Sequence, residues 1–403
     1  MKLGEVIKIN QRGIKKNYPY KNILYADISS VGEGVVGHLE EIILADAPSR
    51  AKRIVLKNDT ILSTVRPRNR SFYYFKEAQD NLIASTGFAV LTPIKEYINE
   101  RFLYYLISNR SFTSYLGNHE KGAAYPAITT DVIENYELEL PILETQKRIA
   151  DILSAYDDLI ENNLKRIKLL EQAAQNIYKE WFVHLRFPGH ENTAIDEETG
   201  LPVGWEEKKL NEITSLITKG TTPTSVGYKF TEEGINFIKA ESYNDNGFFK
   251  RNKFAHISNE AHQKLKRSQL KKDDIIFSIA GVIGRCAIIK SELLPANTNQ
   301  AVAIIRLSET YNNFPSFIKY SLSQKSVRDY TNAIRVQAAQ ANINLKQLGQ
   351  LKIIIPTNEM VIRYNDVVSY NVKQMNILFK YNQKLKAARD ILLPRLMNRM
   401  IEV

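Results

Sequence analysis

Several short polar stretches of the 403-residue chain carry side chains that can hydrogen-bond to the edges of nucleic-acid bases. Arginine pairs with guanine in this way, and asparagine or glutamine pairs with adenine. Two of these stretches, "STVRPRNRSF" and "ANTNQA", lie next to apolar, strand-like runs. Some candidates are expected to be turn or capping residues, and others to contact only phosphate, which positions without specifying. The candidate contacts are Arg66, Arg68, Asn69, Arg70, Lys121, Tyr125, Lys219, Thr221, Thr222, Arg285, Asn297, Asn299, Gln300, Arg335, Gln337, Gln340 and Asn342.

Motifs for catalysis are weak by comparison. The string "GEGVVG", Gly32 to Gly37, fits a dinucleotide-binding fingerprint, but the following segment is interrupted by Pro48 and is too short for the required helix. We therefore expect a turn there. The sequence contains no P-loop string and no Asn/Asp-Pro-Pro-Tyr/Phe string, and its six histidines lack metal-ligand spacing. We predict no catalytic, cofactor-binding or metal-binding residue on this chain.

Composition indicates a basic protein. Lys and Arg number 55 against 44 Asp and Glu, which gives a formal net charge of +11. This excess suits a polyanionic partner, although a solvated basic surface would explain it equally well. The only cysteine, Cys286, lies in an apolar run, where we expect a buried, inert thiol. No signal peptide is visible and no apolar run approaches the ~20 residues of a membrane helix, so we expect a cytoplasmic protein without membrane contact.

The chain repeats itself at a spacing of 215 residues. "KGAAYPAITTDVIENYELELP" in the first half matches "VQAAQANINLKQLGQLKIIIP" in the second, from a double alanine to a proline. A period this long is too long for a solenoid. It predicts a duplicated domain with pseudo-twofold symmetry and two similar sites. Further pairs at the same offset are Asp59 and Asp274, Ile61 and Ile276, Ser63 and Ser278, Tyr105 and Tyr320, and Glu144 and Glu359.

Each half is expected to fold as a mixed α and β domain, which makes the chain an α+β protein. Short β-branched runs such as "RIVLKNDTILSTV" and "QAVAIIRL" favour strands. "INERFLYYLISNRSFTSYL" and "NNFPSFIKYSLSQKSVRDYT" have helical spacing. Each domain closes with a strand-like segment that ends in proline, "YELELP" in the first half and "LKIIIP" in the second.

A long helix follows each of those prolines. Apolar residues alternate at gaps of four and three, the heptad pattern of a coiled coil, and Pro394 is expected to end the second helix. Each helix should hold ~37–40 residues and extend ~55–60 Å, longer than its domain, so the two should pack on each other. An ordinary helix packed only on its own domain is the alternative. The predicted packing residues are Ile149, Leu153, Ile160, Asn163, Ile167, Leu170, Val368, Asn371, Met375, Leu378, Leu385 and Leu392.

The chain resembles the specificity subunit of type I restriction–modification enzymes over nearly its whole length. In the first half the resemblance depends on "YADISSVGEGVV", "STVRP", "KGAAYPAIT" and the long segment "LETQKRIADILSAYDDLIENNLKRIKLLEQAAQNIYKEWF". In the second half it depends on "LPVGWEEKKLNEI", "DIIFSIAGVIGRCAI" and "LPANTNQAVAIIRL". The distal helix departs most, because "TNEMVIRYNDVV" lacks the Gln-Lys-Arg of "ETQKRIADIL".

The resemblance implies two target-recognition domains separated by two long antiparallel helices that form a coiled-coil spacer. Each domain would read one half of a bipartite target on double-stranded DNA. Two methylation subunits would bind S-adenosylmethionine, and restriction (motor) subunits would bind ATP and Mg²⁺, so this chain would hold no cofactor and would not itself be catalytic. The implied organisation is a first target-recognition domain at 1–142, a proximal helix at 143–186, a linker at 187–204, a second target-recognition domain at 205–356, and a distal helix with a C-terminal tail at 357–403.

Two functions of other classes remain as alternatives. A helical interaction scaffold without a DNA role predicts no salt-dependent DNA binding by the complex. A self-sufficient nuclease or methyltransferase predicts that the purified chain alone turns over DNA.

Overall fold

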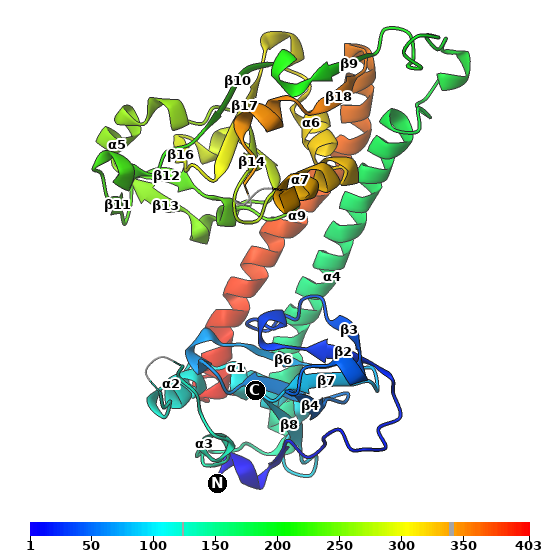
Figure 1. Cartoon of the computed structure of the whole chain (residues 1–403). Helices are drawn as coiled ribbons and strands as arrows, with labels where there is room; N and C mark the ends of the chain where they lie inside the picture. Colours follow the sequence, from blue (N-terminus) through cyan, green and yellow to red (C-terminus); the bar gives the residue numbers. More distant parts are fainter. Residues whose placement is uncertain (123–124, 338–341) are drawn as a thin grey trace. The chain divides into compact units, whose positions relative to one another are not determined.

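The structure is a computed structural model that describes residues 1–122, 125–337 and 342–403 (Figure 1). The chain divides into two compact units. Unit 1 comprises residues 1–162 and 381–403, and unit 2 comprises residues 163–380. The two long helices, α4 (Leu143–Phe182) and α9 (Asn358–Met397), contain 40 residues each and contribute to both units.

Unit 1 holds two four-stranded sheets. The first has the order β1-β8-β5-β6 and is antiparallel throughout, and the second has the order β3-β2-β7-β4, with β2 and β7 parallel. Three helices accompany them, α1 (Glu100–Ser108), α2 (Arg110–Asn118) and α3 (Thr130–Glu134). The strands are β1 (Ile7–Ile9), β2 (Asn22–Ala26), β3 (Glu40–Ile43), β4 (Ala51–Ile54), β5 (Thr60–Ser63), β6 (Phe72–Tyr74), β7 (Leu82–Ser85) and β8 (Phe88–Pro93).

Unit 2 holds two four-stranded sheets, β10-β17-β14-β15 and β11-β13-β12-β16, and the antiparallel pair β18-β9. Its helices are α5 (Asn259–Lys264), α6 (Pro315–Leu322), α7 (Lys325–Gln337) and α8 (Leu345–Gly349). The strands are β9 (Glu206–Lys209), β10 (Thr214–Lys219), β11 (Phe230–Thr231), β12 (Ile235–Ile238), β13 (Ala255–Ile257), β14 (Ile275–Ser278), β15 (Cys286–Ile288), β16 (Ala296–Thr298), β17 (Val302–Leu307) and β18 (Lys352–Ile355).

The predicted duplication is confirmed by the first sheet of each unit. β1, β8, β5 and β6 pair in the same order and sense as β10, β17, β14 and β15. A buried aspartate precedes the central strand in both, and each accepts the backbone N–H three residues earlier at 2.7–2.8 Å. Asp59 also pairs with Arg12 at 2.6 Å, and Asp274 pairs with Arg306 at 2.7 Å.

The second sheets differ at their edges. β3-β2-β7 corresponds to β13-β12-β16, since both place a parallel pair beside an antiparallel one. Unit 1 then adds β4 beside β7, whereas unit 2 adds β11 beside β13. The two units therefore share three strands of the second sheet and differ in the edge strand that is added to them.

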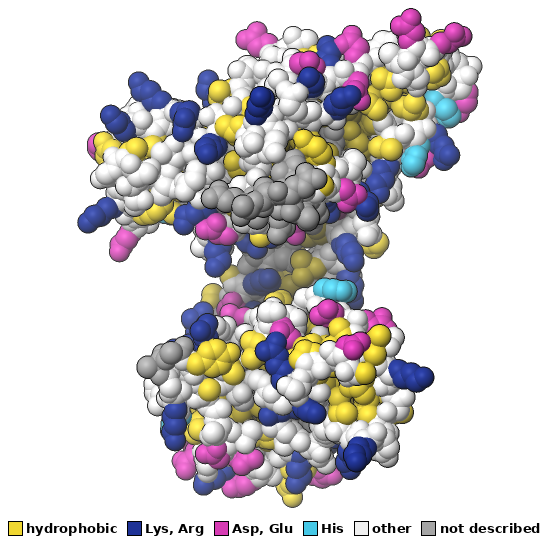
Figure 2. Space-filling model, viewed as in Figure 1, with side chains coloured by type: hydrophobic (Ala, Val, Ile, Leu, Met, Phe, Trp, Pro, Cys, Tyr) yellow, Lys and Arg dark blue, Asp and Glu magenta, His cyan; other side chains and the backbone are white. Residues whose placement is uncertain are grey.

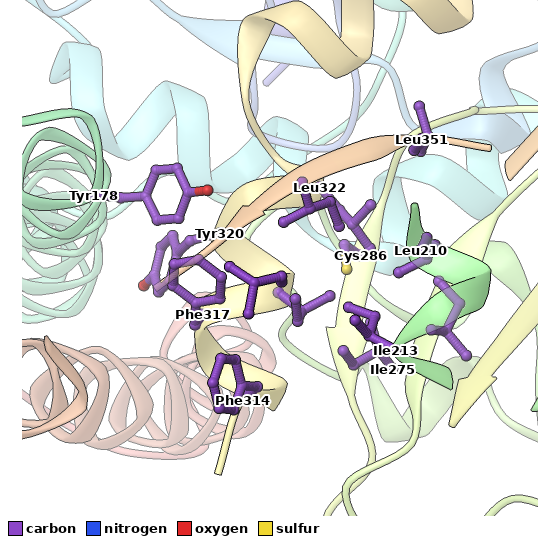
Figure 3. Close-up of a cluster of buried hydrophobic side chains, with 14 of the residues drawn as sticks. Tyr178, Leu210, Ile213, Ile275, Cys286, Phe314, Phe317, Tyr320, Leu322 and Leu351 are labelled. Carbon is purple, nitrogen blue, oxygen red and sulfur yellow. The ribbon is translucent and has the colours of Figure 1, made fainter. Parts of the chain in front are cut away.

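The long helices take part in the hydrophobic cores. In unit 2, Tyr178 of α4 packs near Phe317 and Tyr320 of α6 (Figure 3). Phe182 of α4 and Tyr364 of α9 belong to the same cluster and contact Phe317 and Tyr320. In unit 1, α4 buries Ile149 and Leu153 in the core that α1 forms with the first sheet.

The lone cysteine has the environment that the sequence predicts. Cys286 belongs to the unit 2 core and is 1% exposed. Burial raises the pKa of its thiol to about 12. It is therefore protonated and inert at neutral pH, as expected.

The two helices run antiparallel and in contact within each unit. In unit 1, the Asn382 amide donates to the Ile160 carbonyl at 3.2 Å, and Asp157 pairs with Arg389 at 2.5 Å. In unit 2, Ile167 packs with Met375 and Leu378. All of the predicted packing residues are covered to some degree: Ile149, Leu153, Ile160, Asn163, Ile167, Val368, Met375, Leu378 and Leu385 are buried, and Leu170, Asn371 and Leu392 are half-buried. Ile149 and Leu153 are buried in the unit 1 core and Val368 in the unit 2 core.

Two expectations about element ends are wrong. Pro394 does not end the second helix, since α9 continues to Met397. Proline removes a single N–H, while the Asn398 N–H still donates to the Pro394 carbonyl at 3.0 Å and Leu396 is buried in the unit 1 core. The "YELELP" segment forms no strand; its only ladder contact is an isolated bridge between Lys2 and Glu137. The N-terminal segment facing it is a short 3-10 helix, whereas in unit 2 the equivalent segment, β18, has the strand β9 to pair with.

Candidate nucleic-acid interface

The loop after β5, residues 64–71, carries most of the candidate side chains of unit 1. Its start is fixed from inside, because the Ser63 hydroxyl donates to the Val65 carbonyl at 2.8 Å. It is also tied to a segment about sixty residues later. The Ile128 N–H donates to the Thr64 carbonyl at 2.9 Å, and the Arg66 N–H donates to the Pro126 carbonyl at 2.7 Å. The structure thus brings together two stretches that the sequence singled out separately.

Arg66, Lys121 and Tyr125 lie on this shared exposed surface. The Arg66 guanidinium lies over the Tyr125 ring, 5.3 Å from its centroid, and Tyr125 is 63% exposed. Lys121 is exposed, and its backbone pairs with Ala127 in both directions at 2.9 Å. A cation stacked on an exposed aromatic ring beside a lysine is suited to base and phosphate contacts. Asn69, also exposed, lies in the same loop.

Arg68 and Arg70 have different roles from Arg66. The Arg68 guanidinium pairs with Glu120 at 2.9 Å and donates to the Gly117 carbonyl at 2.7 Å. The Arg70 side chain is 14% exposed; it pairs with Glu33 at 2.8 Å and donates to the Ser108 carbonyl at 2.7 Å. Its remaining donors reach the Thr113 hydroxyl at 2.5 Å. We therefore correct the expectation of a base contact for Arg70, which holds the loop in place instead.

Unit 2 repeats this framework in the loop after β14, residues 279–285. The Ser278 hydroxyl donates to the Val282 carbonyl at 2.5 Å, and the Ile343 N–H donates to the Ile279 carbonyl at 3.1 Å. The Ile343 bond is the counterpart of the Ile128 bond at the 215-residue offset. Ser278 is likewise the counterpart of Ser63, but its acceptor carbonyl lies two residues further along the loop. Arg285 pairs with Asp245 at 2.6 Å, and Asn342 is exposed beside Ile343.

A second polar cluster in unit 2 joins the end of β10 to the end of β16. Gly220 is required here, because a Cβ atom would lie 2.0 Å from the Thr298 carbonyl oxygen. The Thr221 N–H donates to the same carbonyl at 3.1 Å, and the Thr222 hydroxyl donates to the Gln300 side-chain oxygen. Lys219 and Gln300 are both exposed. Four predicted contacts from two distant stretches therefore form one surface.

Comparison with known proteins assigns the family. Residues 1–172 and 202–392 match the family model described as "Type I restriction modification DNA specificity domain". The chain belongs to this family.

Known members of the family match most of the chain. The HindI specificity subunit of Haemophilus influenzae is 25% identical over 98% of both chains. The MjaIX specificity subunit of Methanocaldococcus jannaschii is 24% identical over 85% of this chain and 78% of the relative. Among solved structures, the S subunit of the type I restriction–modification system from M. genitalium has the same fold, with a TM-score of 0.55, 14% identity, and coverage of 98% of this chain and 95% of that one.

Other candidates of this specificity-domain chain have structural roles or are not described. Asn297 is fully buried, and its amide donates to the Leu265 carbonyl at 3.1 Å and contacts the His262 ring. We correct its predicted base contact, since it has no exposed atom to offer. Asn299 accepts the Ala301 N–H at 3.3 Å and so shapes a turn. The side chains of Arg335 and Gln337 lie outside the described part of the chain, as does all of Gln340.

Two arginines at these surfaces were missed by the sequence analysis. Arg267 donates to the Thr221 hydroxyl at 3.3 Å, and Arg50 donates to the Tyr25 hydroxyl at 3.2 Å. The run "KLKRSQLKK" around Arg267 was an available signal, because clustered basic residues favour phosphate contacts. Figure 2 shows Lys and Arg side chains over both units on the face in view, interspersed with acidic ones. No helix in the described part of the chain has an apolar stretch long enough to cross a bilayer.

Proposed function

We propose that this chain is the DNA sequence-recognition subunit of a type I restriction–modification complex, in which each half reads one part of a bipartite target. The observation that supports this most strongly is the repeated loop framework. Each unit holds a loop after its central strand, tied to a distant segment by the same backbone hydrogen bond. The framework repeats while the exposed side chains differ, as two readers of two different half-sites require.

Charge supports the same function. The net charge of +11 attracts a polyanion, and Lys121 and Lys219 are exposed beside the candidate base contacts. Contacts from lysine to phosphate would set the register of each unit on the duplex. The remaining exposed arginine, asparagine and glutamine side chains would read base edges in the major groove.

We assign the chemistry to partner subunits. In this proposal two methylation subunits carry S-adenosylmethionine and restriction subunits carry ATP and Mg²⁺, so this chain contributes recognition without a catalytic step. Exposed apolar residues on the two long helices are the proposed docking sites for the methylation subunits. On α4 in unit 1, Ile152 and Leu159 are 36% and 48% exposed; on α9 in unit 2, Val367 and Tyr370 are 47% and 64% exposed. Ile152 and Val367 are related by the 215-residue offset, as two equivalent docking sites require.

An exchange of the second domain tests the proposal. Residues 206–355 are replaced by those of a relative with a different target, and methylated adenines are mapped in cells that also carry the partner subunits. We expect one half of the methylated motif to change and the other to stay the same. The matched control exchanges residues 1–142 and should change only the opposite half. A change in both halves, or in neither, contradicts the proposal.

Two further measurements test the alternative functions, one on the complex and one on the purified chain. A scaffold without a DNA role would leave the complex with no salt-dependent DNA binding. A self-sufficient enzyme would methylate or cleave DNA with no partner present.

A further inference from the structure

We propose that Arg66 reads a guanine in the half-site of the first domain, that Tyr125 orients its guanidinium, and that Arg70 is a positioning residue for the loop. This inference depends on the proposed function and narrows it from a surface to a single reader and a base. It follows from what distinguishes three arginines that lie within five residues of one another.

The loop is held in a strained, defined shape. Arg66 and Arg70 both adopt left-handed backbone conformations, with φ of +48° and +57°. Non-glycine residues rarely adopt this conformation, and such strain persists only where surrounding contacts enforce it. The contacts are present: Arg70 donates to a carboxylate, a hydroxyl and a carbonyl, and Pro67 between the two strained residues is buried. These contacts therefore hold the backbone at Arg66 in one conformation, which sets the direction in which its side chain leaves the loop.

Arg66 is the arginine of this loop whose guanidinium is still available. Among the residues that the structure describes, no hydrogen bond or ion pair engages that group. Its carbon lies over the Tyr125 ring, 5.3 Å from the centroid. A guanidinium held over an aromatic ring keeps donors along its edge free for other partners. Two of those donors match the O6 and N7 acceptors that guanine presents in the major groove.

The tyrosine favours a base over a phosphate as the ligand. A phosphate contact needs a positive charge within reach but no fixed plane, and Lys121 on the same surface meets that need. A bidentate contact to guanine requires two donors of the guanidinium to lie in the plane of the base. An aromatic ring beside the guanidinium helps to hold that orientation. Tyr125 is 63% exposed, so its ring is accessible at the surface where DNA would bind.

The experiment combines protein variants with an altered base. The complete chain is reconstituted with its methylation subunits, and binding is measured to target DNA in which each guanine of the first half-site is replaced in turn by 7-deazaguanine, which lacks the N7 acceptor. We expect one position to weaken binding of the native complex about 5- to 10-fold and to have no effect on Arg66→Ala. Arg66→Ala itself should lose about 10- to 100-fold in affinity for the native site, the range of one bidentate pair.

Matched variants separate reading from charge. Arg66→Lys keeps the charge and should still lose discrimination at that position, whereas Lys121→Ala should weaken binding to all sequences alike. Arg186→Ala removes an exposed arginine that pairs with Glu180, outside both the loop and the proposed docking faces, and controls for loss of a surface charge. Native-like melting of the Arg66 variants shows that the fold is retained; should Arg66→Ala misfold, Arg66→Lys and Tyr125→Ala carry the test, and Tyr125→Ala should reproduce the relaxed discrimination in part.

Several outcomes would overturn the inference. Arg66 would contact a phosphate if Arg66→Lys bound and discriminated like the native chain. The same conclusion would follow if Arg66→Ala weakened binding without changing the base preference at any single position. A first half-site without guanine would exclude the reading outright. These results leave the proposed function intact, which would fail instead if the native complex methylated no bipartite motif.

Discussion

The loops after β5 and β14 occupy equivalent places in the two units, yet they are built from different residues. Both start from a serine hydroxyl bonded to a carbonyl in the loop, at Ser63 and Ser278, and both receive an isoleucine N–H from a distant segment. The first loop places arginines at its two positive-φ positions, whereas the second places Gly281 and Gly284 there. The frame is common to both domains and the contents are specific to each.

Under the proposed function, this difference predicts which residues of each unit choose the target. Glycine at positive φ carries no side chain and no strain. The second loop therefore offers little besides the Arg285 side chain for contacts to DNA. Unit 2 instead gathers its exposed polar groups at the junction of β10 and β16, around Thr222 and Gln300. Two domains with one frame can therefore read different sequences from different edges of the same sheet arrangement.

The largest effect should come from breaking the shared frame. Asp59 and Asp274 are each 1% exposed and paired with an arginine, and removal of one partner from a buried pair costs about 3–5 kcal/mol. We expect Asp59→Ala and Asp274→Ala to lower the free energy of unfolding by similar amounts, measured by urea denaturation. Glu77→Ala, at an exposed pair with Lys57, should change it by about 0.5 kcal/mol or less. Strongly unequal values for the two aspartates would show that the frames are not equivalent.

A smaller effect should appear where the domains diverge, at Gly220. Alanine there places its Cβ 2.0 Å from a backbone oxygen, so the strand end must shift, at about 1–3 kcal/mol. Gly220→Ala should weaken recognition of the second half-site and leave the first unchanged, as read from methylated motifs. Gly13→Ala is the matched control in unit 1, because its Cβ would meet the nearest atom at an ordinary 3.4 Å. Equal effects of the two substitutions would contradict the close approach at Gly220.

Features that depend on local sequence could be predicted, and those that depend on distant partners could not. The heptad seam and the buried, inert Cys286 could be predicted because the spacing of apolar residues along the chain determines which side chains are buried. The availability of Arg66 could not be inferred from "VRPRNR", because it depends on Glu33, 37 residues from Arg70, and on Glu120, 52 residues from Arg68. The base contact predicted for Asn297 was wrong for the same reason, because its side-chain amide donates to the carbonyl of Leu265, a residue distant in the sequence. The domain boundaries stay a prediction.

Arg70 and Arg285 offer a third contrast between the loops. Arg70 makes contacts to three partners and is 14% exposed, whereas Arg285 pairs with an aspartate that is 77% exposed. We expect Arg70→Ala to destabilise the chain by about 1–3 kcal/mol, because it leaves the Ser108 carbonyl and Thr113 hydroxyl with one partner fewer. Arg285→Ala should cost about 1 kcal/mol or less. Thermal unfolding of both variants measures the difference, and a larger loss at Arg285 would reverse the assignment.

The smallest effect concerns the pair that distinguishes unit 2, Thr222 and Gln300. Thr222→Val keeps the shape of the side chain but removes the hydroxyl that donates to the Gln300 oxygen. The net value of such a bond is about 0.5–1.5 kcal/mol, or roughly 2- to 10-fold in affinity. The loss should appear with the native target and disappear when the adenine of the second half-site is replaced, because an unrestrained Gln300 amide pairs less well with adenine. Thr224→Val is the matched control, since the Thr224 side chain makes no hydrogen bond within the described residues. An equal loss in Thr224→Val, or a loss that persists after that adenine is replaced, would mean that Gln300 is not oriented by Thr222 for reading.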